Sequence, residues 1–235
     1  MRPELIAGAP QDWFPPDTAA LAEPNGLLAV GGDLSAARLL AAYRRGIFPW
    51  YEEGQPILWW TPEPRCVLDP RELRVSHRLR RTLRQARFTV SWNGDFGGVI
   101  RGCAAPRASG EGTWITPAMI AAYERLHRLG HAHSIEIHRG GHLVGGLYGI
   151  ALGAAFFAES MFSRERDASK FALVALCARF AGIRESLIDC QIPSPHVIGL
   201  GAKLLPRSEF LRDLARAIAA AGPFDLPSGP SLGKI

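Results

Sequence analysis

The spacing of apolar residues in the second half of the chain predicts a short series of strands between helices. Apolar positions recur with helical spacing in residues 116–130 and 168–182, and a glycine closes or follows each stretch. Strand-like patterns occupy residues 132–138, 142–151, 153–163 and 186–192. Short turns join the first three, which favours antiparallel pairing. The sequence therefore predicts an α+β fold with a mainly antiparallel sheet.

The first half of the chain is less regular and is rich in Pro, Gly and Trp up to about residue 70. A clear helical pattern covers residues 33–46, where Asp33 or Ser35 is suited to the N-cap position. The change in pattern between the two halves predicts a small N-terminal α/β domain of residues 1–90 and a larger domain of residues 91–235.

An arginine-rich segment, residues 71–87, carries much of the excess positive charge of a chain whose net charge is +5 and whose pI is near 9.3. It predicts a helix whose buried stripe is Val75, Leu79 and Leu83. Glu72 is the one acid in the segment, so few acidic partners are available at helical spacing. This favours a phosphate-facing surface, although an ordinary solvated face stays open. The candidate phosphate-binding residues are Arg74, Arg78, Arg81 and Arg84.

Several other kinds of protein or site are disfavoured. No apolar run approaches the roughly 20 residues that span a bilayer, and we expect no leader peptide. The scattered cysteines favour reduced thiols in the cytoplasm, with Cys190 as a buried structural thiol. The histidines of residues 131–142 form no recognisable ligand pattern, and the glycines of "LVGGLYGIALG" lack dinucleotide-binding spacing. We expect no metal and no cofactor.

Two strand-like segments carry carboxylates in apolar surroundings. Alternation puts Glu159 on the face of Phe157 and Met161, and it puts Asp189 beside Gln191. A buried carboxylate is costly unless it is hydrogen-bonded, so each requires a structural or chemical explanation. Both remain open at this point: a structural network, or a site that orients an amine and takes its proton.

Long stretches of the chain resemble the leucyl/phenylalanyl-tRNA–protein transferase family. They are "EPNGLLAVGGDLS", "AYRRGIFPWY", "PILWWTPEPR", "EGTWITPAM", "LGHAHSIEIH", "LVGGLYGIALG", "ESMFSRERDASK", "IDCQ" and "LGAKLLPR". The resemblance implies an acetyltransferase-like (GNAT) C-terminal domain. It also implies transfer of Leu, Phe or Met from aminoacyl-tRNA to the α-amine of proteins that begin with Arg or Lys, which creates a degradation signal. We expect a monomer with no membrane partner.

The resemblance also implies roles for individual residues. Asp189 and Gln191 would orient and deprotonate the attacking amine, and Glu159 would line the reaction centre as a third catalytic residue. The candidate substrate-binding residues are Trp50, Trp114, Leu147, Phe156, Met161, Leu173, Phe180 and Ile188. Leu147 stands where the family often has Met, and Gly199 stands where it often has Ser.

Two alternatives come from other functional classes. An RNA-binding protein without catalysis would use the arginine-rich helix and exposed tryptophans, and it would have no use for Asp189 and Gln191. A small-molecule acetyltransferase would bind the pyrophosphate of acyl-CoA through a glycine- and arginine-rich loop, of which "SRERDASK" is a poor version.

Overall fold

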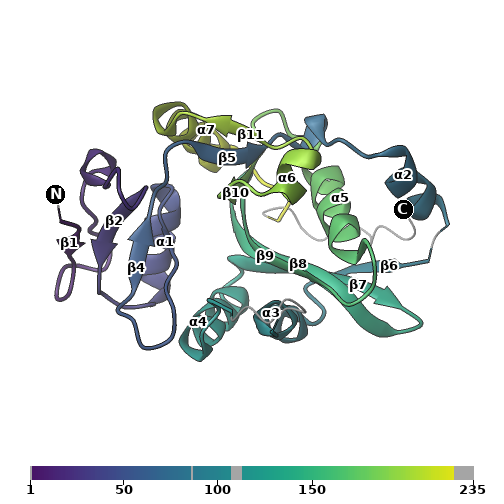
Figure 1. Ribbon diagram of the computed structural model, residues 1–235, viewed down its shortest axis with the longest axis horizontal. Coiled ribbons are helices and arrows are strands. Elements are labelled where there is room, and N and C mark those ends of the chain that lie inside the picture. The colour runs from purple at the N-terminus through teal and green to yellow at the C-terminus, as the bar shows by residue number, and fades with distance from the viewer. Residues whose placement is uncertain (1, 86, 107–112, 225–235) are drawn as a thin grey trace.

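The computed structural model describes residues 2–85, 87–106 and 113–224. Ala86 of the expected basic helix, Glu111 and Gly112 of the "EGTWITPAM" stretch, and the last residues of the expected large domain lie outside the described residues. Within the described residues the strands form two sheets, which lie side by side along the long axis (Figure 1).

The order of the strands across each sheet differs from their order along the chain. The small sheet consists, from one edge to the other, of β1 (Glu4–Leu5), β2 (Leu27–Val30), β4 (Leu58–Trp60) and β3 (Phe48–Pro49). The large sheet consists, likewise, of β11 (Lys203–Leu205), β5 (Arg65–Leu68), β10 (Leu187–Gln191), β9 (Ala155–Ser163), β8 (His142–Leu152), β7 (Ala132–Arg139) and β6 (Thr89–Trp92). Neighbours in the large sheet are antiparallel except β9 and β10.

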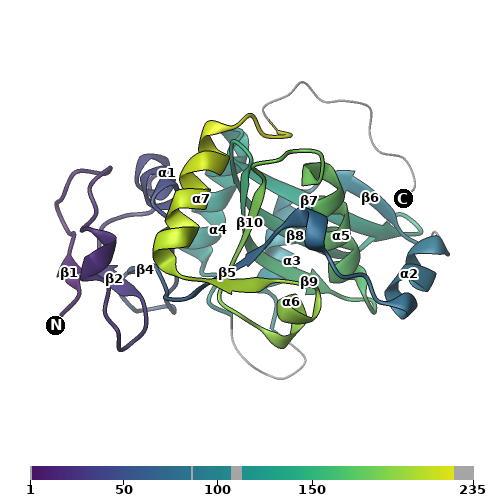
Figure 2. The ribbon, with the colours of Figure 1, turned by 90° about the horizontal axis from the view of Figure 1, so that it is seen from above.

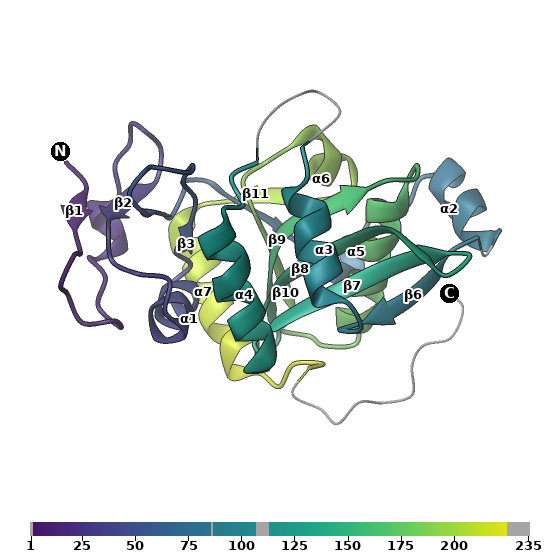
Figure 3. The ribbon, with the colours of Figure 1, turned by 90° about the horizontal axis from the view of Figure 1, so that it is seen from below.

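Helices cover both faces of the large sheet. The described helices are α1 (Ala36–Arg44), α2 (His77–Arg84), α3 (Phe96–Ala104), α4 (Pro117–Arg128), α5 (Ala168–Phe180), α6 (Pro195–Gly199) and α7 (Arg207–Ala219), with 3-10 turns η1 (Asp17–Ala19) and η2 (Pro70–Glu72). Seen from below, α3 and α4 lie side by side on one face (Figure 3), and α5 lies on the other (Figure 1). No described helix combines the length and apolarity needed to cross a membrane.

The core has a separate part on each face of the large sheet. Side chains of α1, α3, α4 and α7 form one cluster, which continues into the small sheet. Side chains of α5, with contributions from α2 and α6, form the other. The predicted α+β class with a mainly antiparallel sheet is confirmed.

The chain passes from the small sheet to the large sheet well before residue 90, where we expected the division between two domains. β4 ends at Trp60 in the small sheet, and β5 begins at Arg65 in the large one. Because β5 pairs with both β10 and β11, the chain enters the large sheet well before residue 90. The basic helix α2 consequently lies at the opposite end of the molecule from β1 (Figure 1). The division into residues 1–90 and 91–235 as independent units stays a prediction.

The parallel pair of β9 and β10 requires a crossover, which α5 supplies. The chain leaves the end of β9, runs through α5 and returns at the start of β10, so both strands point the same way. Residues near the C-terminal ends of the two strands are therefore brought together.

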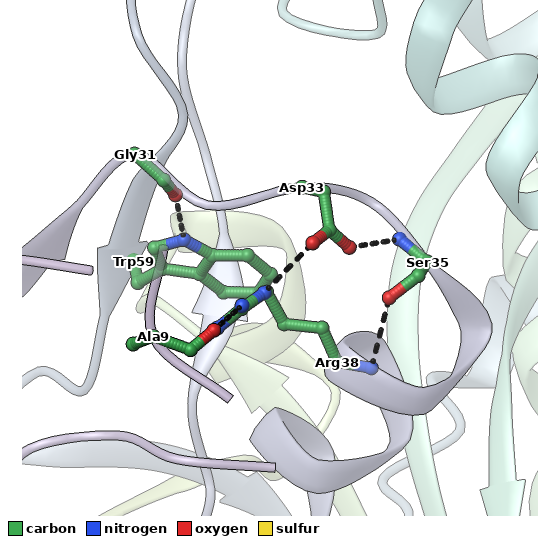
Figure 4. A network of polar contacts seen from close by, with 6 residues as sticks. All are labelled: Ala9, Gly31, Asp33, Ser35, Arg38 and Trp59. Atoms are coloured by element: carbon green, nitrogen blue, oxygen red, sulfur yellow. Dashed lines mark hydrogen bonds and ion pairs between the residues drawn. The ribbon is translucent and has the colours of Figure 1, made fainter. Parts of the chain in front are cut away.

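Polar contacts hold α1 against the small sheet (Figure 4). The buried Arg38 side chain donates to the carbonyl oxygen of Ala9 over 2.9 Å and to Asp33 over 3.4 Å. Ser35 caps the helix by accepting from the Arg38 backbone N–H. Beside them, the Trp59 indole donates to the carbonyl oxygen of Gly31 over 2.8 Å. These contacts fix α1, which lies beside α7 when seen from above (Figure 2) and also packs against α4.

Candidate active site

The candidate site lies where β9 and β10 separate. Their backbone pairing ends at Asp189 and Phe157, just before Gln191 and Glu159. Both strands are irregular here. β8 pairs with Ala158 and Ser160 and skips Glu159, while β5 pairs with Asp189 and Gln191 and skips Cys190. The two irregularities are β-bulges, which commonly redirect side chains beside functional sites.

A continuous chain of buried polar groups runs through the site. The Gln191 amide donates to Glu159 Oε1 over 2.7 Å, and the Tyr123 hydroxyl donates to Glu159 Oε2 over 2.9 Å. The hydroxyls of Tyr123 and Tyr43 lie 2.5 Å apart. Four elements, α1, α4, β9 and β10, therefore converge on one carboxyl group.

Asp189 is part of a buried ion pair. Its two oxygens accept from Arg65 Nε over 2.8 Å and Arg65 Nη2 over 2.6 Å, and both side chains are at most 1% exposed. The Arg65 guanidinium lies between the rings of Phe48 and Phe210, at 4.8 and 4.7 Å from their centroids. Asp189 Oδ1 also accepts from the backbone N–H of Gln191, whose φ is 60°. Asp189 thus holds an unusual backbone conformation at Gln191.

The environment of Glu159 favours its neutral form more than water does. Burial raises the pKa of this carboxyl from 4.5 to about 7, and the nearby charge of Asp189 acts in the same direction. Hydrogen bonds from Tyr43, Tyr123 and Gln191 act against the rise. The group can therefore change its protonation state near neutral pH.

An open pocket of about 350 Å³ adjoins this polar chain. Of the residues predicted from sequence, Glu159 and Gln191 line it together with Trp50, Trp114, Met161 and Leu173. Trp50 is 40% exposed, which suits a side chain at the rim. The pocket thus combines an apolar and aromatic lining with one carboxyl and one amide group.

Four other predicted residues do not line this pocket. Leu147, Phe156, Phe180 and Ile188 are fully buried in the core on the α5 side of the sheet. Asp189 is likewise buried against Arg65 instead of facing the pocket. Alternation put Asp189 beside Gln191, but the bulge at Cys190 separates them, so Gln191 lines the pocket and Asp189 does not.

Cys190 was expected to be a buried structural thiol, but it is only partly buried and lies in the pocket wall. A hydrogen bond with Cys66 and burial raise the pKa of Cys190, so its thiol is a poor nucleophile near neutral pH. Among the candidate histidines, His133 is buried against Phe224, and burial lowers its pKa to about 4. The described residues contain no cluster of three or more His, Cys, Asp or Glu side chains suited to a metal ion.

The candidate phosphate-binding residues form a separate surface. Arg78, Arg81 and Arg84 are exposed on α2, and Arg74 is exposed just before it. Arg81 and Arg84 line a shallow groove together with His77 and Arg80. In the described part of the chain, no ion pair engages any of the four candidates. Their charge is available to a partner.

The protonation of Glu159 predicts an effect on stability. Between pH 4.5 and about 7 the folded protein keeps a proton that the unfolded chain loses, so the free energy of unfolding falls as pH rises through this window. Glu159→Gln removes this contribution, worth about 3 kcal/mol. In urea unfolding, the free energy of unfolding of the variant, relative to that of the parent, should rise by about this amount between roughly pH 4.5 and pH 8. A constant difference across the range would contradict the assignment.

The buried Glu159–Gln191 pair in an aromatic pocket is typical of an enzyme site. The basic surface on α2 is separate from this pocket. Together they suit a ligand that has both apolar and anionic parts. A model of the leucyl/phenylalanyl-tRNA protein transferase family matches residues 67–215. A model of the N-terminal domain of these transferases matches residues 32–63. The chain belongs to this family.

Individual relatives agree with the family models. The leucyl/phenylalanyl-tRNA–protein transferase of Aromatoleum aromaticum is 59% identical over 210 residues, covering 89% of this chain and 88% of the relative. That of Solidesulfovibrio magneticus is 61% identical over 199 residues, covering 84% and 80%. The predicted enzyme class, an aminoacyltransferase that moves an aminoacyl group from tRNA to protein, is confirmed.

Solved structures give a looser match. A GCN5-related N-acetyltransferase from Kribbella flavida aligns with a TM-score of 0.36 and 11% identity, over 71% of this chain and 60% of that one. This likeness is too loose to bear on function.

Sequence reasoning missed three residues of the polar chain. Arg65, Tyr43 and Tyr123 all contact candidate catalytic residues or one another inside the core. An arginine between apolar residues in "PRCVL" was the available signal for Arg65. The tyrosines carry no such signal, because they occupy positions typical of an apolar helix face.

Proposed function

We propose that this enzyme transfers Leu, Phe or Met from aminoacyl-tRNA to the α-amine of proteins whose first residue is Arg or Lys, and so marks them for degradation. The observation that carries the proposal is the Glu159–Gln191 pair in the wall of an apolar pocket. The acceptor preference and the degradation signal rest on the family resemblance. We also propose that the enzyme acts as a monomer in the cytoplasm.

The pocket supports the proposed donor. The aminoacylated end of tRNA carries a flat adenine and, for Leu or Phe, an apolar side chain. Trp50 and Trp114 offer surfaces on which a base can stack, and Met161 and Leu173 offer apolar contact. We propose that Leu147, Phe156, Phe180 and Ile188 form the apolar layer behind these residues that limits how far the side chain enters.

The reaction joins an amine to an ester that is already activated. The acceptor amine attacks the ester carbonyl carbon, a tetrahedral intermediate forms, and the bond to the tRNA ribose oxygen breaks. The proton lost by the amine ends on that departing oxygen. The task of the protein is to place the amine and to stabilise the charges that develop.

In this proposal, Gln191 places the amine. Its Nε2 is engaged by Glu159, which leaves its Oε1 to accept an N–H of the attacking amine. The ionised Glu159 would favour the positive charge that develops on the amine during attack. Asp189 acts through the backbone of Gln191, which it holds at positive φ while Arg65 fixes Asp189. Asp189 is then a positioning residue.

Transfer from differently charged tRNAs tests the proposal. Single-turnover transfer to an Arg-initial peptide should be efficient from leucyl- and phenylalanyl-tRNA. Transfer from alanyl-tRNA should be slower by at least roughly 10–200-fold, which is the effect of losing a single methylene group from an apolar pocket. The same peptide with a blocked α-amine is the control and should receive nothing. Equal transfer of alanine would contradict the pocket assignment.

Charge reversal on α2 tests the tRNA surface. Arg78→Glu, Arg81→Glu and Arg84→Glu together should weaken tRNA binding and flatten its salt dependence, because fewer counterions are released. Folding should persist, since Leu79 is the residue of α2 that is buried in the core. Binding is measured across a salt series.

A matched control reverses the exposed Arg125, Arg128 and Arg212 of α4 and α7, which changes the net charge by the same amount. Long-range attraction would weaken equally in both triple variants. An equal loss of affinity would therefore show that α2 is ordinary solvated surface.

A further inference from the structure

Two buried tyrosines extend the polar chain away from the pocket. The Tyr123 hydroxyl donates to Glu159 Oε2, and the Tyr43 hydroxyl lies 2.5 Å from that of Tyr123. Both tyrosines are fully buried, and neither is among the residues that line the pocket. They can influence a substrate in the pocket only through Glu159.

The hydrogen bonds of Glu159 fix the rotation of its carboxyl group. Oε1 receives the Gln191 amide over 2.7 Å, while Oε2 receives Tyr123 over 2.9 Å. Without the tyrosine hydroxyl, Oε2 would be left in the core without this donor, which is costly for a buried carboxylate. The group would then rotate or take up a proton, and its hold on Gln191 would loosen.

Tyr43 ties this arrangement to α1. Its ring packs against Phe157 at a centroid distance of 5.0 Å, two residues before Glu159. The start of the same helix is held against the small sheet by Arg38 (Figure 4). The hydroxyl chain therefore crosses from a helix seated on the small sheet to the carboxyl group in the large sheet.

We propose that Tyr43 and Tyr123 are positioning residues of the transfer reaction, which hold the Glu159 carboxyl toward Gln191. Through Tyr43, the orientation of this carboxyl depends on the position of α1 against the small sheet. The inference rests on the proposed roles of Glu159 and Gln191. It adds two residues on helices outside the pocket to the machinery of the same site.

Several polar and titratable groups face Glu159 in the core. They are Tyr43 on α1, Tyr123 on α4, Tyr148 on β8, Asp189 on β10 with its partner Arg65 on β5, and Gln191. Hydrogen bonds from Tyr43 and Tyr123 lower the pKa of Glu159 against the larger effect of burial. Removing either hydroxyl should raise that pKa further. A reaction that requires ionised Glu159 should then need a higher pH.

Three conservative substitutions test the proposal. In Tyr123→Phe, single-turnover transfer from phenylalanyl-tRNA to an Arg-initial peptide should fall roughly 10–100-fold near neutral pH, the scale of one hydrogen bond to a charged group. The acidic limb of its pH–rate profile should move up by about one pH unit. Tyr43→Phe should shift the limb in the same direction, because a hydrogen bond from Tyr43 also lowers the pKa of Glu159.

Tyr148→Phe is the matched control. Its hydroxyl is also fully buried near Glu159, but it has no hydrogen-bond partner among the described residues. This variant should keep the rate and the pH–rate profile of the parent. Thermal melting verifies that each variant is folded, and Tyr43→Phe decides the matter if Tyr123→Phe does not fold.

The outcomes separate this inference from the proposed function. If the parent transfers and the folded Tyr43 and Tyr123 variants keep its rate and profile, the inference is overturned and the function stands. An equal loss at every pH, with the limb unmoved, would assign the tyrosines to structure and also overturn it. A parent that does not transfer would overturn the proposed function, and the inference with it.

Discussion

Asp189→Asn is expected to lower both the free energy of unfolding and the rate of transfer. The asparagine has one oxygen for the three N–H groups that Asp189 accepts, two from Arg65 and one from Gln191. Arg65 would keep a buried positive charge without its counterion, at a cost of about 3–5 kcal/mol. Transfer should fall about 10²-fold, because Gln191 would no longer be held for reaction. Urea unfolding and single-turnover transfer measure the two effects.

The double variant Arg65→Met with Asp189→Asn separates stability from chemistry. It removes the orphaned charge and places an apolar side chain between Phe48 and Phe210. The free energy of unfolding should recover toward the parent value while transfer stays low. If Asp189→Asn alone kept the stability and rate of the parent, the buried pair would have no part in either.

Gln191→Met is expected to reduce transfer about 10²–10³-fold, the range seen when one preorganised hydrogen-bonding group is removed from a reaction centre. Methionine has a similar length but lacks the amide that engages Glu159 and, in our proposal, the amine. Binding of tRNA should be preserved, because the arginines that we propose as its phosphate-binding residues lie on and beside α2. Single-turnover rates and tRNA affinity are measured side by side.

Gln191→Asn serves as the comparison. It keeps an amide and tolerates the positive φ of this position, but it is one methylene too short to reach Glu159 in the same way. Its rate should lie between those of the parent and Gln191→Met. A Gln191→Met variant that transfers as fast as the parent would leave the amide without a role.

Elements with strong local signals were predictable from sequence. The helix expected over 116–130 is α4 (Pro117–Arg128), and the strands expected over 132–138 and 142–151 are β7 and β8, each within about a residue. Periodicity, caps and glycine turns define these elements without help from distant residues. We did not predict α3, in which Gly97 and Gly98 obscure the helical pattern, or α7.

The helix predicted for the arginine-rich segment was too long. A helix was expected over 71–87, but the segment contains the end of η2, an irregular link and the short α2 (His77–Arg84). Ser76 accepts from the backbone N–H of Leu79, so it starts a new helix instead of continuing one. Of the expected buried stripe, Leu79 is buried, while Val75 and Leu83 are half-buried.

The candidate site was predictable in its residue types but not in its pairings. Glu159 and Asp189 stood out as carboxylates in apolar strands. Arg65, however, lies 124 positions from Asp189, and Tyr43 lies 80 positions from Tyr123. Such contacts follow from the tertiary fold, which local periodicity does not encode. The bulges at Glu159 and Cys190 also break the alternation on which the sequence prediction relied.

The central claim is that the enzyme forms a peptide bond between a tRNA-borne amino acid and an N-terminal Arg or Lys. The most direct measurement incubates the protein with leucyl-tRNA carrying labelled leucine and with peptides that differ only in their first residue. We predict labelled leucine on the α-amine of the Arg and Lys peptides, and none on the same peptides beginning with Asp or with a blocked amine. The account would be contradicted if the protein bound leucyl-tRNA but left the Arg and Lys peptides unlabelled. It would also be contradicted if the protein transferred acetyl from acetyl-CoA in place of leucine.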